Sequence, residues 1–330
     1  MDFVRCESGS LLARVAMAAA LWCACLPDPA AACSVCLAGD PVFSTLGASA
    51  QQAGDLSVFV QLQAFEKTAG VLAHAGGPPP APDEVERADD QRLDLFVAWS
   101  PRDRLTLTLD LPFAFNEIFE DGETHRASGM GDLGLCASVV AWRDREVLPS
   151  AWVEARAFVE APTGDTTRAA HGEIDPHLQP GTGSWDLGVG LAAVKRLERA
   201  ALYASLFYRE NRSGDFGHHA YEYGDAVLAT AALELPLGHA LARPALEPFT
   251  LGAELDFRFA EHDRADGARF AHSGGSILYA TPSLRIRLPF RVRERPASLR
   301  AAVQSPLTSA WLHGTQREDE VWSFGLYLPL

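Results

Sequence analysis

Apolar and polar side chains alternate along most of the chain in stretches of about ten residues, each followed by a polar break. The clearest stretch, residues 105–111, reads LTLTLDL, so leucines fill one face of an extended strand and threonine and aspartate fill the other. Twelve such stretches follow one another, at residues 56–66, 91–100, 104–113, 131–142, 151–161, 185–196, 201–210, 225–235, 249–259, 276–288, 298–311 and 321–330.

The breaks between these stretches alternate in length. The long, polar breaks are residues 67–90, 116–128, 162–182, 210–223, 261–273 and 313–320, and the mostly short ones are 101–103, 143–149, 196–199, 236–247 and 289–297. Long loops on one side and short turns on the other are typical of bacterial outer-membrane barrels. The pattern predicts an all-β fold: a single transmembrane antiparallel β-barrel of about 12 strands with long outer loops and short periplasmic turns.

A soluble β-sandwich is the alternative, because its strands also alternate. Sandwich strands average about 5–6 residues, whereas tilted strands of about ten residues match an apolar band ~25 Å thick. The tryptophans fall near predicted strand ends: Trp99, Trp142 and Trp152 on the periplasmic side, and Trp185, Trp311 and Trp322 on the outer side. We therefore expect aromatic belts at both interfaces, where the amphipathic indole is favoured.

The N-terminus has the features of a secretory signal. An apolar run at residues 15–26 precedes Ala30-Ala31-Ala32, which fits a small-residue cleavage site before Cys33. The predicted organisation is a signal peptide at 1–32, a periplasmic tether at 33–55 and an outer-membrane barrel at 56–330. A lipoprotein signal that uses Cys33 is the alternative. Cys33 and Cys36, in CSVC, are placed for a local disulfide or remain free thiols, with metal or redox chemistry as a further alternative.

The composition excludes some partners. The chain has 330 residues and a formal net charge of −15, so we expect no nucleic-acid partner, which would require basic surface. No apolar run of about 18 residues follows the N-terminal segment, so no transmembrane helix is predicted in the mature chain. We expect membrane lipid and a small solute as partners and no cofactor, and the sequence does not determine an oligomeric state.

Charged residues occupy one face of several predicted strands. In a membrane barrel they line a wet lumen, and their mixed signs predict internal ion pairs that hold the barrel together or tune permeation. The lumen candidates are Asp94, Asp110, Glu154, Arg156, Glu160, Asp186, Glu254, Asp256, Arg258, Arg285, Arg287 and Arg300. We also expect Gly188 and Gly190 to face inward, where bulk would crowd the lumen.

Three segments resemble a known family. Gly129–Leu135 (GMGDLGL), Ala161–Asp165 (APTGD) and Leu178–Ala192 (LQPGTGSWDLGVGLA) are similar to signature segments of the outer-membrane transporters named for the meta-pathway of phenol degradation. The resemblance implies an outer-membrane β-barrel that takes up small, often apolar organic compounds.

Histidines gather in the predicted outer loops. His171, His177, His218 and His219, with nearby carboxylates, suggest metal capture at the barrel mouth, although their spacing matches no standard ligand motif. No nucleophile–base pair or phosphate-binding loop is recognisable, so we expect no enzyme. The sequence predicts a bacterial outer-membrane channel or transporter for a small molecule, with a metal-binding barrel and then an outer-membrane hydrolase as alternatives.

Overall fold

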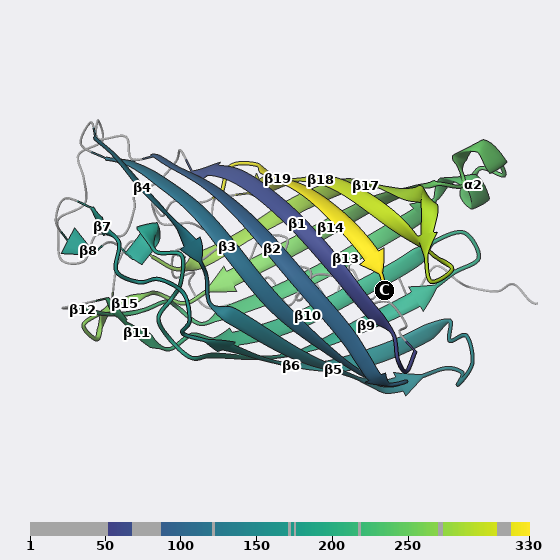
Figure 1. The fold of residues 1–330 in the computed structure, drawn as a ribbon, viewed down its shortest axis with the longest axis horizontal. Coiled ribbons are helices and arrows are strands. Elements are labelled where there is room, and N and C mark those ends of the chain that lie inside the picture. The colour runs from purple at the N-terminus through teal and green to yellow at the C-terminus, as the bar shows by residue number, and fades with distance from the viewer. Residues whose placement is uncertain are drawn as a thin grey trace, which may run out of the picture.

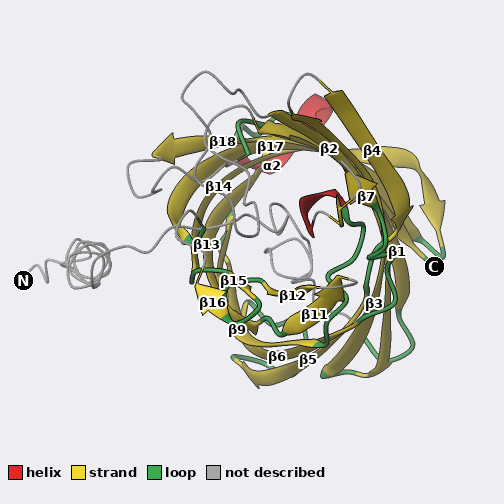
Figure 2. Ribbon diagram, turned by 90° about the vertical axis from the view of Figure 1, so that its left-hand side faces the viewer, coloured by secondary structure: helices red, strands yellow, loops and turns green. Residues whose placement is uncertain are grey.

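A computed structural model describes residues 52–67, 87–120, 123–170, 173–174, 176–216, 219–269, 273–308 and 318–330. Twelve long antiparallel strands form one closed barrel (Figures 1 and 2). They are β1 (Leu56–Lys67), β2 (Arg87–Arg102), β3 (Leu105–Glu120), β5 (Leu133–Arg143), β6 (Ala151–Ala161), β9 (Asp186–Arg196), β10 (Ala201–Glu210), β13 (Ala226–Pro236), β14 (Phe249–Ala260), β17 (Gly275–Val292), β18 (Arg295–Thr308) and β19 (Val321–Pro329).

Each barrel strand pairs with the next one along the chain, and β19 pairs with β1 to close the ring. This arrangement confirms the predicted fold class and all twelve predicted strands. Closure leaves the ring of twelve barrel strands without a free edge, so each barrel strand has backbone partners on both sides. Within the described part of the chain, no helical segment is long and apolar enough to cross a membrane.

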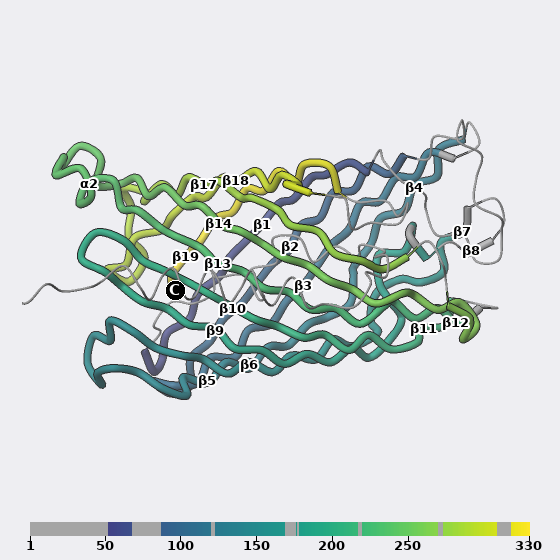
Figure 3. Tube along the Cα trace, turned by 180° about the vertical axis from the view of Figure 1, so that it is seen from behind, coloured from purple at the N-terminus to yellow at the C-terminus, as the bar shows by residue number. Residues whose placement is uncertain are grey.

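The two ends of the barrel differ, as Figure 3 shows from behind. At the short-turn end, β17 and β18 are joined through Arg293 and Glu294, which both have positive φ, as tight two-residue hairpin turns require. At the same end, the link between β13 and β14 contains two short helical elements, α2 (Leu237–Ala240) and η3 (Pro244–Leu246). We call the opposite end the long-loop end.

Short elements extend the barrel at the long-loop end. They are β4 (Glu123–Met130), β7 (Ala169–Ala170), β8 (Glu173–Ile174), η2 (Pro176–Leu178), β11 (Ser213–Phe216), β12 (His219–Glu222), β15 (Arg264–Ala265) and β16 (Ala268–Arg269). β4 pairs with the second half of β3, so the expectation of a loop at 116–128 was wrong: most of this range is an extended hairpin. The outward residues Thr124, Arg126 and Ser128 of β4 are polar, and Arg126 Nε lies 2.7 Å from Glu117 Oε2. A search for apolar alternation therefore did not find this strand.

The apolar face of the barrel points outward. On β9, Leu187, Val189 and Leu191 are exposed, whereas Asp186 on the alternate face is fully buried. Soluble proteins place these residue types the other way round. Lipid tails solvate an outer apolar band in membrane barrels, so the inversion is the one that such a barrel requires.

Candidate functional site

The twelve predicted lumen residues occupy the inward positions of their strands, where they are buried, form ion pairs or hydrogen bonds, or line the cavity, and their role in permeation stays a prediction. The strand registers place Glu154, Arg156 and Glu160 on β6 in line with Ala192, Gly190 and Asp186 on β9. The same holds for Glu254, Asp256 and Arg258 on β14, which are paired with Thr281, Tyr279 and Ile277 on β17. The inner wall is therefore rich in ionisable groups.

Most of these charges are neutralised by a partner of opposite sign. Arg156 Nη2 lies 3.1 Å from Glu154 Oε2, and Arg300 Nη2 lies 2.5 Å from Glu254 Oε1. Both pairs join residues that the sequence placed in the lumen. Asp256 is satisfied differently, since it accepts hydrogen bonds from Thr230 Oγ1, Thr281 Oγ1 and Gln304 Nε2.

Several ion-pair partners of the predicted lumen residues were not predicted from the sequence. Arg209 bridges Glu160 and Asp186, at 2.5 Å and 2.6 Å. Arg258 pairs with Glu318 at 3.0 Å. Arg92, Glu234 and Glu318 were missed in the same way; Arg92 pairs with Asp94 at 2.5 Å and Glu234 with Arg285 at 2.8 Å. Arg209 and Arg92 were recoverable, because each shares the polar face of its predicted strand.

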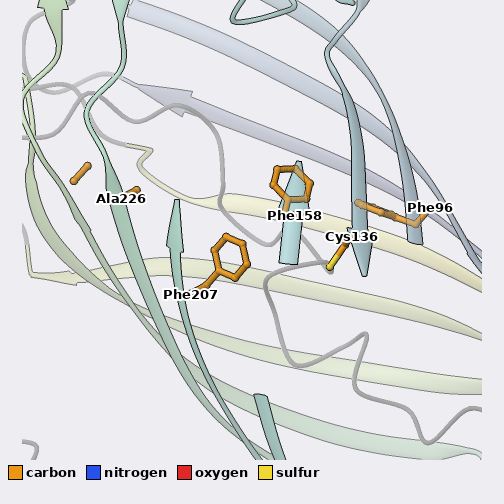
Figure 4. Packing of buried hydrophobic residues seen from close by; sticks show 6 residues of the cluster. Phe96, Cys136, Phe158, Phe207 and Ala226 are labelled. Atoms are coloured by element: carbon orange, nitrogen blue, oxygen red, sulfur yellow. The ribbon is translucent and has the colours of Figure 1, made fainter. Parts of the chain in front are cut away.

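Phenylalanines also face the lumen, which the sequence analysis did not anticipate. Phe96, Cys136, Phe158 and Phe207 belong to one buried apolar cluster, which Phe59 extends. Figure 4 shows the side chains of Phe96, Cys136, Phe158 and Phe207. Phe59 stacks on Phe96 at 6.1 Å between ring centroids, and Phe158 meets Phe207 edge-on at 6.4 Å. The lumen is therefore not uniformly polar: an apolar band interrupts its ionic lining.

Glycines make room for these rings. A Cβ at Gly188 or Gly190 would lie 2.5 Å from a ring carbon of Phe207, and a Cβ at Gly325 would lie 2.5 Å from Phe59 Cζ. Gly188 and Gly190 thus face inward, as expected. Each ring occupies the recess that a neighbouring glycine leaves on the wall.

One tryptophan prediction was wrong. Trp99, Trp142, Trp185 and Trp322 are exposed on the barrel surface near strand ends, but Trp152 is only 2% exposed. Its Nε1 donates to Glu154 Oε1 at 2.9 Å, so it faces inward. The prediction used only the position of Trp152 near a strand end. Because side chains alternate along a strand, Trp152 lies on the same face as Glu154 and Arg156, two and four positions further along β6, and that face points inward. Trp311 lies outside the described residues.

The three segments that carry the family resemblance meet at one junction in the long-loop end. Asp132 accepts hydrogen bonds from the backbone nitrogens of Gly164 (2.7 Å) and Thr182 (2.5 Å) and from Thr182 Oγ1 (2.8 Å). A Cβ on Gly164 would lie 2.7 Å from Gly181 Cα and 2.9 Å from the carbonyl carbon of Gly131. Side chains at these glycines would push the segments apart, so the glycines permit the contact.

This junction holds the described residues 162–170 and 176–184, which we call the inward segment, across the barrel mouth. Asn116, on the inner face of β3, donates from Nδ2 to the carbonyls of Leu178 (3.3 Å) and Gln179 (3.0 Å). Leu178 is almost fully buried, and Figure 2 shows a short helical turn inside the ring of strands beside β7. Asp165 accepts hydrogen bonds from Thr167 Oγ1 and N, which lower the pKa of its carboxyl below the usual value. The segment narrows the long-loop end of the lumen.

The short-turn half of the lumen contains a cavity of about 1100 Å³. Its walls carry the apolar Phe59 and Phe96, the ion pair Glu154–Arg156 and the arginines Arg285, Arg287 and Arg300. The cavity lies toward the short-turn end, because residues of the 236–248 link also line it. A small organic molecule fits a space of this size.

The metal hypothesis rests on residues that the structure leaves largely undescribed. His171 and His218 lie outside the described residues, as do the side chains of His177 and His219. Cys33 and Cys36 also lie outside them. Within the described ranges, no group of three or more histidine, cysteine or acidic side chains is arranged to hold a metal ion.

Comparison with solved structures agrees with the barrel fold. The chain is similar to the COG4313 outer membrane channel from Pseudomonas putida F1, at 18% identity over 85% of this chain and 97% of that one, with a TM-score of 0.63. The translocator domain of the autotransporter NalP from Neisseria meningitidis gives 10% identity over 86% and 90%, with a TM-score of 0.43. The CymD monoaromatic hydrocarbon channel gives 8% over 85% and 89%, with a TM-score of 0.39.

The last two similarities are too distant to bear on function, and the first, at 18% identity, establishes the fold alone. No family model matches the chain. No curated protein matches it in sequence either.

Proposed function

We propose that the protein is a channel or transporter that admits a small molecule through the bacterial outer membrane. The observation that carries this proposal is the inverted barrel: leucines face outward, while paired charges and a cavity of about 1100 Å³ lie inside. An apolar exterior is stable in lipid, and a charged interior is stable only with water or counter-charges. Lipid is accordingly the partner of the outer surface, and the long-loop end faces the exterior.

The lumen favours a small solute. The inward segment, residues 162–170 and 176–184, narrows the outer mouth, and the cavity behind it has the volume of a site for one organic molecule. We infer passage rather than catalysis, because Glu160 and Asp186 are held by Arg209 instead of being left to react.

The family of the meta-pathway of phenol degradation is part of the proposal. Its three signature-like segments meet at Asp132, where they position the inward segment. The structurally similar protein from Pseudomonas putida F1 is described as an outer membrane channel, which supports the same function here. Through this family we propose a small apolar or aromatic organic solute.

Planar-bilayer recordings test this proposal directly. We expect discrete current steps from the purified protein, unchanged by zinc or by a chelator. Liposome swelling with sugars, amino acids and aromatic compounds then ranks the solutes. Absence of both current and swelling would overturn the channel, and tight zinc binding without current would support the metal-binding alternative.

A further inference from the structure

Three aromatic side chains form a row across neighbouring strands of the cavity wall. Tyr327 on β19 is directly paired with Phe59 on β1, which is directly paired with Phe96 on β2. All three line the cavity, and Phe59 lies over the recess at Gly325. This row offers a flat apolar surface, against which planar groups stack favourably.

Three arginines stand beside this row on β17 and β18. Arg285 and Arg300 are directly paired across the two strands, and Arg287 lies two positions from Arg285 on the same face. All three line the same cavity. These three guanidinium groups therefore lie on one side of the cavity, and Arg156 and Arg199 line it elsewhere.

The carboxylates nearby do not neutralise all three arginines. Arg300 pairs with Glu254 and Arg285 with Glu234, at 2.5 Å and 2.8 Å. Arg287 Nη2 instead donates to the carbonyl oxygen of Glu247 at 2.8 Å, and Arg287 has no ion pair within the described part of the chain. A guanidinium has five N–H donors, so one carbonyl contact leaves most of this group available.

The aromatic and cationic rows share one register. Phe96, Phe59, Tyr327, Ser298 and Arg287 are successive partners across β2, β1, β19, β18 and β17, strands that lie side by side in Figure 1. Neighbouring strands are about 4.8 Å apart. Ser298 thus separates the tyrosine from the arginine by two strand spacings, which long side chains bridge. Across the cavity, Arg156 is already paired with Glu154.

We propose that this wall binds small monocarboxylates that have a flat apolar body, with the ring on the Phe59–Tyr327 surface and the carboxylate on Arg287. Arginine suits this role, because its planar fork matches a carboxylate. The inference rests on the proposed function, since the ligand is the solute that enters the lumen. It narrows that function to organic anions, whereas the family resemblance implies apolar compounds in general.

The test is block of single-channel current by benzoate, compared with acetate and with benzyl alcohol at equal concentrations. We expect benzoate to reduce the current at concentrations where acetate, which lacks the ring, and benzyl alcohol, which lacks the charge, do not. Arg287→Gln should raise the half-blocking concentration about tenfold, as the loss of one charge-assisted hydrogen bond predicts. Phe59→Leu should weaken the block as well.

Arg291→Gln is the matched control, because Arg291 lies on the same strand and donates to the carbonyl of Glu294 in the turn, away from the cavity lining. It should leave the block unchanged. Equal block by acetate or benzyl alcohol in a conducting channel would overturn the site and leave the channel intact. If no current is seen, calorimetry of benzoate with the detergent-solubilised protein decides: benzoate binding that Arg287→Gln weakens about tenfold upholds the site without the channel, and no binding overturns both.

Discussion

At the scale of single residues, the lumen is stabilised by contacts in which a glycine makes room for a ring or a charge is paired with the opposite charge. Phe207 fills the space over Gly188 and Gly190, and Arg209 bridges Glu160 and Asp186. Neither pair is local in the chain. Changing one member therefore leaves the other with a clash or an uncompensated charge.

Gly188→Ala tests the recess under Phe207. The new methyl would lie 2.5 Å from a ring carbon of Phe207, so we expect a loss of about 1–3 kcal/mol, which is typical of overpacking. Urea unfolding in bilayers measures it. In a Phe207→Ala background the same substitution should cost much less, and an unchanged cost there would contradict the proposed clash.

Arg209→Ala leaves two buried carboxylates without their cation. We expect destabilisation of about 3–5 kcal/mol, because an unpaired buried charge is costly. Arg212→Ala is the control: its pair with Glu210 is half exposed and should contribute about 0–1 kcal/mol. Similar urea midpoints for the two variants would show that the Arg209 bridge is solvated.

At the scale of elements, the inward segment (residues 162–170 and 176–184) and the paired strands β3 and β4 shape the described part of the outer mouth. The described residues of this segment are held by hydrogen bonds to Asp132 and Asn116 and by the packing of Leu178 against Ile118. Tyr223 also donates a hydrogen bond to the carbonyl oxygen of Pro176.

Asp132→Ala should release this segment. It removes the acceptor for two backbone nitrogens and one hydroxyl, so we expect larger and noisier single-channel currents. Asp144→Ala is the control at the opposite end, where the carboxylate accepts hydrogen bonds from Ser150 and Ala151 that hold the pKa of Asp144 well below its usual range. Identical currents in the Asp132 variant and the wild type would mean that the segment is held elsewhere.

At the scale of the whole molecule, the barrel separates two solvents. Strand alternation directs one set of side chains to lipid and the other to the enclosed cavity, and ring closure keeps the two apart. Adjacent residues on one strand should therefore respond oppositely to the same substitution.

Leu109→Arg and Thr108→Arg make this comparison on β3. Leu109 is exposed on the outer face, and Thr108 lines the cavity. Leu109 lies two positions beyond Leu107, which is paired with the interface residue Trp99, so we expect arginine at position 109 to cost about 1–2 kcal/mol, between the values for the interface and the bilayer midplane, and to cost less at position 108. Folding yield into bilayers measures both. Equal costs would argue against lipid contact at Leu109.

The amino-acid sequence by itself determined the strands, their number and the direction of most side chains. Each follows from alternation with a period of two, which is local along the chain. Trp152 shows that the odd or even place of a residue in a strand predicts whether its side chain points inward or outward better than its distance from the strand end does. The same parity places Arg92 and Arg209 inside, so their location was within reach of the sequence.

Only the tertiary structure decided which inward residues meet. The Asp132 junction joins segments about 30 and 50 residues away along the chain, and the row from Phe96 to Arg287 includes strands from both termini. Such contacts depend on barrel closure and strand register, which set the height of each residue on the wall. Alternation specifies a side chain's face but not its height on the wall, so the sequence placed the arginines in the lumen, and only the closed ring showed that they share a cavity with the aromatic row.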